Sequence, residues 1–308
     1  MILEQRFGAA QVAVRAIDKL LGCAQTSTAH TVDAIRREIF NTAWQLICQK
    51  HAVGSLVNLL NPLLYQLDSV TTVAELQRTV SASLTTFRHQ LTHRVPDTAV
   101  HSMSVLSQCQ RIMLYGYSTT VLYALQHALR NGQRIEVVCV SGTHTDAHLA
   151  LCHRIAAIGL TVSTLEYAHV ETALDRVDAV VVGADTLDAY GLINTVGTAQ
   201  LATVAHAAHI PFYSFCTSEK FLPDAFFHGE RQPSPLDGCA CTPSADTPKP
   251  LDVTPIEQVT GVITERGSLP APAIEAWLAA ERIHPWLSGR GTMLDIHHLL
   301  QPYPVPRS

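Results

Sequence analysis

The residues best suited to do chemistry lie in one stretch, GADTLDAYGLINTVGT, at positions 183–198. Asp185 follows the apolar run DAVVV, and Asn194, Gly197 and Thr198 lead into the helical pattern AQLATVAHAAH. Backbone amides at a helix N-terminus, together with the Thr198 hydroxyl, can hold a phosphate group. The alternative is that Asp185 caps a turn which the glycines merely permit. From spacing alone, a ligand site and a plain turn are equally good interpretations.

A second stretch, YGYSTT at 115–120, also joins a strand pattern to a helix pattern. The hydroxyls of Ser118 and Thr119 could contact an anion, although a simple helix N-cap is the plainer explanation. The spacing alone therefore favours a capped helix here.

Two groups of metal-binding residue types are weak candidates. His144 and His148 are spaced so that both could bind zinc from one helix face, but the stretch THTDAHLALCH matches no closed metal motif in a chain with 16 histidines. Cys239 and Cys241 form a Cys-x-Cys pair without a second pair nearby, which is typical of exposed loop thiols. We expect no metal site and no cofactor.

The first ~95 residues, which precede these stretches, have helical apolar spacing. The helix over 72–91 should begin at a capping box formed by Thr72 and Glu75, and we expect Pro96 to close it. Pro62 should stop or kink the helix in SLVNLLNPLLYQL. The pattern predicts a helical N-terminal domain over residues 1–105.

From about residue 110, short apolar runs alternate with helical segments. The runs include RIMLYG, RIEVVCV, DAVVVGAD, IPFYSF and VTGVITERG. Such alternation predicts an α/β domain, residues 106–308, with a parallel sheet covered on both faces. Ligands in such domains bind at the carboxyl ends of strands where the strand order reverses. The Pro- and Gly-rich residues 222–250 should form a long loop.

Composition excludes several classes of protein. With 47% hydrophobic and 15% charged residues the chain of 308 is globular, and its net charge of −5 without a basic run argues against nucleic-acid binding. No apolar stretch is long enough to span a membrane, and the start MILEQRFGAAQ does not resemble a secretory signal. The scattered cysteines favour thiols in a reducing compartment, so we expect a cytoplasmic protein. No Gly-x-Ser-x-Gly, P-loop or Gly-x-Gly-x-x-Gly motif is present.

An ordered series of motifs resembles a known superfamily. Residues 180–221 contain GAD, N, GT, PFY and KF in the family order, and residues 251–267 resemble its closing DVTP and TERG. QRFGAAQVAVRAIDKLL, at 5–21, is similar to the opening helix of bacterial members. The superfamily joins the alpha, beta and delta subunits of translation initiation factor 2B with isomerases of methylthioribose-1-phosphate and ribose-1,5-bisphosphate. The resemblance implies a helical N-terminal domain on a Rossmann-like C-terminal domain.

The resemblance also implies which residues form the site. The isomerases use a cysteine and the aspartate of GAD as an acid–base pair; Asp185 matches the aspartate, but Gly116 stands at the cysteine position. The family Asn-Lys pair becomes Asn194-Thr195, and YGYSTTVL resembles the HGYSRTVL of the initiation-factor subunits. The implied ligand contacts are Arg6, Tyr117, Ser118, Thr119, Asn194, Thr195, Gly197, Thr198 and Lys220.

These departures favour binding over catalysis. Sugar isomerisation usually takes two positioned groups, and loss of one costs ~10²–10⁴ in rate. We interpret the chain as a homodimeric, non-catalytic regulatory protein that binds a phosphorylated sugar or nucleotide, a partner protein, or both. One alternative is an aldose–ketose isomerase that pairs Asp185 with Tyr115, Tyr117 or a histidine. Another is an initiation-factor subunit within a larger complex.

The binding interpretation makes a geometric prediction. Asp185 should face a cavity also lined by Ser118, Asn194 and Lys220, with Arg6 reaching across from the N-terminal domain. In the opposite case Tyr115 or Tyr117 fills the space and Lys220 points into solvent.

Overall fold

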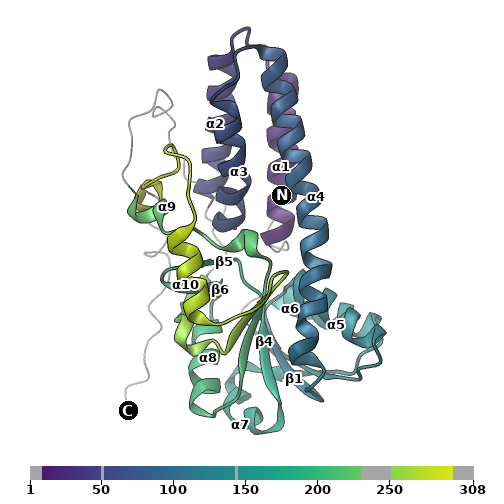
Figure 1. Cartoon of the computed structure of the whole chain (residues 1–308). Helices are drawn as coiled ribbons and strands as arrows, with labels where there is room; N and C mark the ends of the chain where they lie inside the picture. Colours follow the sequence, from purple (N-terminus) through teal and green to yellow (C-terminus); the bar gives the residue numbers. More distant parts are fainter. Residues whose placement is uncertain (1–8, 50–51, 143–144, 230–250, 294–308) are drawn as a thin grey trace.

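The computed structural model describes residues 9–49, 52–142, 145–229 and 251–293, and it contains a helical part and an α/β part (Figure 1). Arg6, His144, Cys239 and Cys241 lie outside these residues. The helical part is built by α1 (Ala9–Thr26), α2 (Val32–Cys48), α3 (Val53–Leu67) and the upper half of α4 (Val73–Leu106). Because α4 continues down beside the sheet, one rigid helix belongs to both parts.

Neither Pro96, which was expected to close a helix, nor Pro62, which was expected to stop or kink one, ends its helix. Thr72 caps α4 as predicted, accepting a hydrogen bond from the Glu75 amide at 3.2 Å. However, α4 runs through Pro96 for ten more residues to Leu106, and α3 runs through Pro62 to Leu67. A proline inside a helix is costly, so tertiary packing must offset it. The residues of α4 beyond Pro96 provide this packing, since Thr98, Ala99, Ser102, Val105 and Leu106 are all buried.

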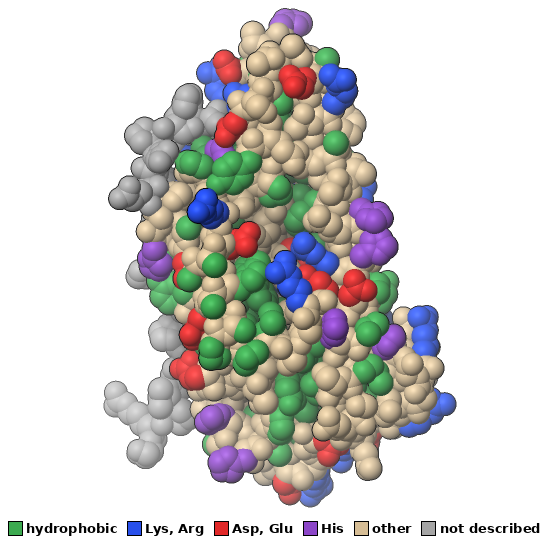
Figure 2. Space-filling model, in the orientation of Figure 1, with side chains coloured by type: hydrophobic (Ala, Val, Ile, Leu, Met, Phe, Trp, Pro, Cys, Tyr) green, Lys and Arg blue, Asp and Glu red, His purple; other side chains and the backbone are tan. Residues whose placement is uncertain are grey.

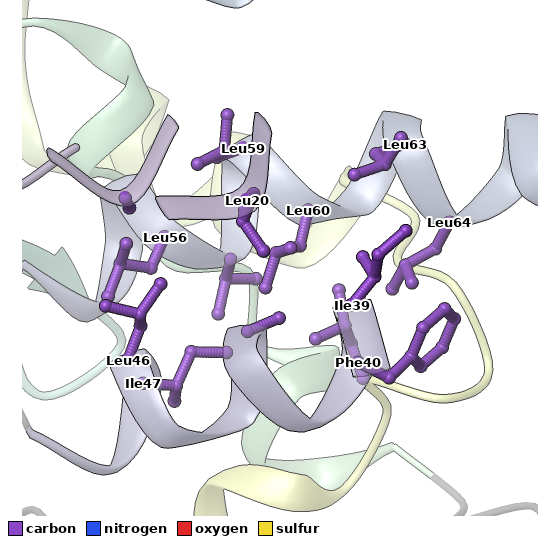
Figure 3. Packing of buried hydrophobic residues seen from close by; sticks show 14 of the residues in the cluster. Leu20, Ile39, Phe40, Leu46, Ile47, Leu56, Leu59, Leu60, Leu63 and Leu64 are labelled. Carbon is purple, nitrogen blue, oxygen red and sulfur yellow. The ribbon is translucent and has the colours of Figure 1, made fainter. Parts of the chain in front are cut away.

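The helical part has its own hydrophobic core. Leucine and isoleucine side chains of α1, α2 and α3 point toward one another in Figure 3, among them Leu20, Ile39, Leu56 and Leu60. Every one of these four side chains is 2% exposed or less, as expected for the buried stripe of an amphipathic helix.

A segment from the far end of the chain completes this core. Ile283, Trp286 and Leu287 are buried within it, and the Trp286 ring lies edge-on to Phe40 with centroids 4.8 Å apart. Asn61 in α3 fixes the segment by accepting from the His284 amide at 2.7 Å and donating to the Arg282 carbonyl at 2.9 Å. The last described segment therefore returns to the helical part.

The α/β part is a seven-stranded sheet with the order β10-β9-β7-β4-β1-β2-β3. The bounds are β1 Arg111–Tyr115, β2 Glu136–Ser141, β3 Val162–Glu166, β4 Ala179–Val182, β7 Phe212–Phe215, β9 Gly261–Thr264 and β10 Gly267–Leu269. All neighbours pair in parallel except β9 and β10. The order runs one way from β1 to β3 and the other way from β4 to β9, so it reverses between β1 and β4. The predicted parallel sheet is confirmed.

Helices cover both faces of the sheet. One face packs against α5 (Thr119–Arg130), α6 (Thr145–Ala157) and the lower end of α4. The other packs against α7 (Val170–Ala173), α8 (Thr198–Ala207) and α10 (Ala271–Ala280). Alternate residues along β1 enter the two cores, with Ile112 and Leu114 on the first face and Met113 and Tyr115 on the second. This arrangement explains why the strands are almost continuously apolar.

A second, smaller sheet was not predicted. Its three antiparallel strands have the order β5 (Thr186–Asp188), β6 (Gly191–Thr195) and β8 (Leu251–Thr254). Gly191 is required where β6 begins, because its φ is 135° and an added Cβ would lie 2.2 Å from the Thr254 carbonyl oxygen. The stretch 183–198 is therefore largely a hairpin, not the loop that its glycines suggested.

Three smaller expectations can also be compared with the structure. Helix α9 (Ala225–His228) forms inside the expected loop 222–250, most of which lies outside the described residues. Cys23, Cys109, Cys139, Cys152 and Cys216 are free thiols, but Cys48 is disulfide-bonded, contrary to expectation. No described helix combines the length and the hydropathy needed to cross a membrane.

Acidic and basic side chains are interspersed on the face shown in Figure 2.

Candidate functional site

The candidate site lies where the strand order of the large sheet reverses. Gly116 directly follows β1, and Gly183 to Asp185 directly follow β4. The backbone of Gly116 has φ 76°, a left-handed conformation that L side chains adopt at a cost. Neighbouring parallel strands whose connections leave in opposite directions open a crevice at their carboxyl ends, and this is the usual place for a ligand in such sheets.

Residues 184–186 form hydrogen bonds to three other segments of the chain. The Asp185 amide donates to the Ile193 carbonyl in β6 at 2.9 Å. The Lys220 ammonium donates to the Ala184 carbonyl at 2.8 Å, and Thr186 Oγ1 accepts from the Gly54 amide in α3 at 3.2 Å. Asp185, Lys220, β6 and the start of α3 therefore meet at one point.

Asn194 and Thr195 turn polar atoms toward Gly116. A Cβ built on Gly116 would lie 3.5 Å from Thr195 Oγ1 and 3.8 Å from Asn194 Nδ2. Thr195 is 5% exposed and Asn194 is 6% exposed, and neither Thr195 Oγ1 nor Asn194 Nδ2 has a hydrogen-bond partner within the described part of the chain. A buried donor without a partner costs roughly 1–3 kcal/mol, so such groups usually mark a place that something else occupies.

The N-terminus of α8 is closed by an internal carboxylate. Asp252 Oδ2 accepts from the amides of Gly197 at 2.7 Å and Ala199 at 3.1 Å. The Thr198 hydroxyl, which the sequence suggested as a phosphate contact, donates to the Thr195 carbonyl at 2.6 Å. Burial raises the pKa of Asp252 to about 6, with the backbone amides working against that shift. These amides are thus already satisfied from within the fold.

The N-terminus of α3 also lies at this site, where the Gly54 amide of its first turn donates to Thr186 Oγ1 at 3.2 Å. Its N-cap residue is Ala52, with φ 52° and no side-chain hydrogen bond to the first turn. The first turn packs closely against the segment that carries Lys220, since a Cβ on Gly54 would lie 2.2 Å from the Lys220 carbonyl oxygen. The positive end of the α3 dipole therefore lies beside Lys220 and Thr186.

Lys220 itself is buried, with only 4% of its surface exposed. The alternative in which Lys220 points into solvent is therefore wrong. Among the described residues its ammonium has the Ala184 carbonyl as acceptor, whereas a protonated lysine carries three donors.

The residues at the end of β1 and just after it have structural roles. The Tyr115 hydroxyl donates to the Val196 carbonyl at 2.6 Å, and its ring meets Tyr167 edge-on at 5.4 Å. Tyr117 turns toward α6, where the Arg154 guanidinium carbon lies 5.8 Å from its ring centroid. The Tyr115 hydroxyl and the Tyr117 ring therefore both contact other parts of the fold.

Ser118 and Thr119 begin α5. The Ser118 Oγ accepts from the Val121 amide at 3.3 Å, which confirms the predicted N-cap. An added Cβ on Gly183 would lie 2.6 Å from Ser118 Cβ, so the end of β4 touches the start of α5. Ser118 therefore borders the crevice, and Thr119 is the half-buried first residue of the helix.

No cluster of three or more His, Cys, Asp or Glu side chains is placed to bind a metal ion within the described ranges. His148 instead contacts a neighbour on the same helix, with Nε2 3.7 Å from Cys152 Sγ. Asp252, Thr186 and the start of α3 are the site features that sequence reasoning missed. The DVTP motif that contains Asp252 was visible in the sequence, but its partners lie more than 50 residues away.

Asp188, at the end of β5, makes folding stability depend on pH. Burial, aided by the nearby Asp224 carboxylate, raises the pKa of Asp188 to about 7, while amide hydrogen bonds from Tyr190 and Gly191 oppose the shift. The native state therefore holds a proton that the unfolded chain loses near pH 4, so this group makes the protein less stable as pH rises from about 4 to 7.

We predict that Asp188→Asn removes this contribution. Its melting temperature, relative to that of the wild type, should rise between pH 5 and pH 8, as thermal unfolding across that range would show. Asp175→Asn is the matched control, because the Asp175 side chain is 78% exposed and should not change the pH profile. Parallel curves for Asp188→Asn and the wild type would contradict the assignment.

Comparison with known proteins agrees with this architecture. The chain is 29% identical over 278 residues to a ribose 1,5-bisphosphate isomerase of Haloferax volcanii, covering 87% of this chain and 85% of that protein. It is 32% identical over 183 residues to a ribose 1,5-bisphosphate isomerase of Archaeoglobus fulgidus, covering 56% of this chain and 57% of that protein. It is 28% identical over 179 residues to eIF2B subunit alpha of Dictyostelium discoideum, covering 53% of this chain and 56% of that protein. The matches to the last two relatives thus span little more than half of their lengths.

Two solved structures from Pyrococcus horikoshii share the fold. A translation initiation factor eIF-2B superposes with a TM-score of 0.67 at 21% identity, over 87% of this chain and 93% of that one. A 5-methylthioribose 1-phosphate isomerase superposes with a TM-score of 0.59 at 22% identity, over 88% and 83% respectively. The model of the initiation factor 2 subunit family matches residues 5–271. The chain belongs to the initiation factor 2 subunit family.

Proposed function

We propose that this chain is a non-catalytic member of its family that binds a phosphorylated sugar or nucleotide at the carboxyl ends of β1 and β4, in a regulatory role. One observation carries the proposal. Two buried polar atoms, Asn194 Nδ2 and Thr195 Oγ1, face a glycine and have no partner among the described residues. Such a place suits the hydroxyl or phosphate oxygens of a ligand better than a packed core.

Two groups at the crevice supply positive charge for an anion, although carboxylates also lie nearby. The Lys220 ammonium and the N-terminus of α3 supply positive charge, and the Asn194 amide supplies a donor. Gly197 and Thr198 are left out of the proposed contacts, because Asp252 and the Thr195 carbonyl already engage them. Arg6, which the family resemblance implies as a contact, remains part of the proposal although it lies outside the described residues.

Catalysis would need a second titratable group opposite Asp185. Gly116 has no side chain, and the Tyr115 hydroxyl donates to a backbone carbonyl. Cys216 precedes Lys220 by four residues, but it is fully buried and burial raises its pKa to about 12, so it stays protonated. This set of groups supports a site that binds and orients a sugar phosphate without moving a proton.

The ligand test begins with the intact protein. We predict that ribose 5-phosphate or AMP raises the melting temperature and that Asn194→Asp weakens this binding by about tenfold or more, because a carboxylate would face the anion. Asn131→Asp is the control, since Asn131 lies exposed at the end of α5. The site would be contradicted if the ligand raised the melting temperature of Asn194→Asp as it does that of the wild type, or if both variants lost the same affinity.

The alternative function is sugar-phosphate isomerisation. It is favoured by the names of the similar proteins from Archaeoglobus and Haloferax, both ribose 1,5-bisphosphate isomerases. We predict negligible conversion of ribose 1,5-bisphosphate or methylthioribose 1-phosphate, followed by proton NMR. Turnover within the ordinary enzyme range of ~1–10³ s⁻¹ would overturn the non-catalytic proposal in favour of this alternative.

We also propose that the chain forms a homodimer, as symmetric pairs are the commonest soluble oligomers. Support for assembly of this fold into complexes comes from a solved structure with a TM-score of 0.68, described as a tetrameric eIF2B-beta2-delta2 complex. Light scattering at micromolar concentration should give twice the 33.5 kDa chain mass. A purely monomeric species would refute the dimer and leave the ligand proposal standing.

A further inference from the structure

The 217–221 turn, formed by Thr217, the 3-10 helix Ser218–Lys220 and Phe221, is buried and held from two sides. On the side of α3, Asn58 Nδ2 donates to the carbonyls of Glu219 at 2.8 Å and Phe221 at 2.6 Å. The turn also carries Lys220, whose ammonium reaches the residue before Asp185. The position of that ammonium therefore depends on how the turn is fixed.

Two carboxylates fix the other side of the turn. Glu219 Oε1 accepts from the Thr217 hydroxyl at 2.6 Å. Glu265, in the connection from β9 to β10, accepts from the Ser218 amide at 2.9 Å and also from the Ser218 hydroxyl. The Glu219 side chain is completely buried and that of Glu265 is 11% exposed, so both charges need compensation.

Arg94 supplies that compensation from the helical part of the chain. Its Nη1 lies 3.6 Å from Glu219 Oε2, and its Nε lies 3.6 Å from Glu265 Oε1. Arg94 stands on α4, two residues before Pro96, where the helix passes from the bundle to the sheet. The planar guanidinium can bridge two carboxylates, which a lysine ammonium does less well.

We infer that Arg94 is a positioning residue for Lys220. Arg94 neutralises Glu219, which keeps the 217–221 turn buried, and the turn in its place holds the Lys220 ammonium beside Asp185. Without Arg94 the buried Glu219 charge is uncompensated, and the turn relieves this by exposing Glu219 and carrying Lys220 away from Ala184. The consequence for ligand affinity rests on the proposed function, whereas the consequence for Lys220 does not.

Acylation of lysines in the intact protein tests the inference without a ligand. The chain has four lysines, at 19, 50, 220 and 249, so peptide mass spectrometry after treatment with an N-hydroxysuccinimide ester resolves each one. Lys220 should react slowly in the wild type and about tenfold faster in Arg94→Met, while exposed Lys19 reacts equally in both. Arg94→Lys should give an intermediate rate.

Arg36→Met is the matched control. Its side chain is 21% exposed, against 23% for Arg94, and it donates to the carbonyls of Leu67 at 2.6 Å and Val70 at 3.3 Å, away from the turn. It should leave Lys220 protected. Unchanged labelling in Arg94→Met, or equal exposure of Lys220 in both variants, would overturn the inference.

A double variant distinguishes the proposed effect of Arg94 from a general loss of folding. Glu219→Gln removes the buried charge, so adding it to Arg94→Met should restore much of the protection of Lys220. Failure to restore protection would show that Arg94 acts in some other way.

Affinity for AMP, measured by calorimetry, then separates the two proposals. Arg94→Met should bind AMP about tenfold more weakly, and Arg36→Met should bind as the wild type does. If the wild type binds neither AMP nor ribose 5-phosphate, the proposed function fails while the labelling result still decides the role of Arg94.

Discussion

The reversal of strand order between β1 and β4 is the constraint on which the site depends. Because connections leave these two strands in opposite directions, their carboxyl ends border a crevice. Several backbone segments converge there. Gly116 turns sharply after β1, Gly183 admits the start of α5, and the β5–β6 hairpin returns Asn194 and Thr195 to the same point. Polar side chains are therefore brought together at this point.

The N-termini of α8 and α3, which both lie at this edge, have different hydrogen-bond partners. Asp252 closes the N-terminus of α8 with a carboxylate, so that helix offers its first amides to the protein itself. The N-terminus of α3 has an alanine at its N-cap and lies beside the Lys220 segment. A sequence contains both helix starts, but only the packing shows that a carboxylate, Asp252, accepts from two amides of α8, whereas a hydroxyl, Thr186 Oγ1, accepts from the Gly54 amide of α3. The proposed anion site accordingly relies on Lys220 and Asn194 and not on the start of α8.

The sequence predicted the large elements well, for a physical reason. Strands such as β1 and β4 are buried on both faces, so their continuous apolar runs are easily recognised in the sequence. The errors arose where distant contacts override local preference. Packing of the lower half of α4 holds a helix through Pro96, and β8 pairs with β6 across more than 50 residues of chain. Asp185, Asn194 and Lys220 could be picked out because motifs mark them, whereas Arg94 lies in an ordinary helical pattern that gives no hint of Glu219.

The geometry around Gly116 also bears on how a binding protein could share a fold with enzymes. A Cβ at this position would fit the space, since its nearest neighbours are 3.5 Å and 3.8 Å away. The obstacle is the backbone, because φ 76° costs an L residue roughly 1–2 kcal/mol. A cysteine side chain there would therefore need a different turn after β1 as well as a different residue. Thr195 also stands where the family resemblance expects a lysine, so the site differs at two positions from the pattern that the resemblance implies for the isomerases. The glycine is thus part of the local conformation, and the proposed binding role is built into the backbone as well as into the missing side chain.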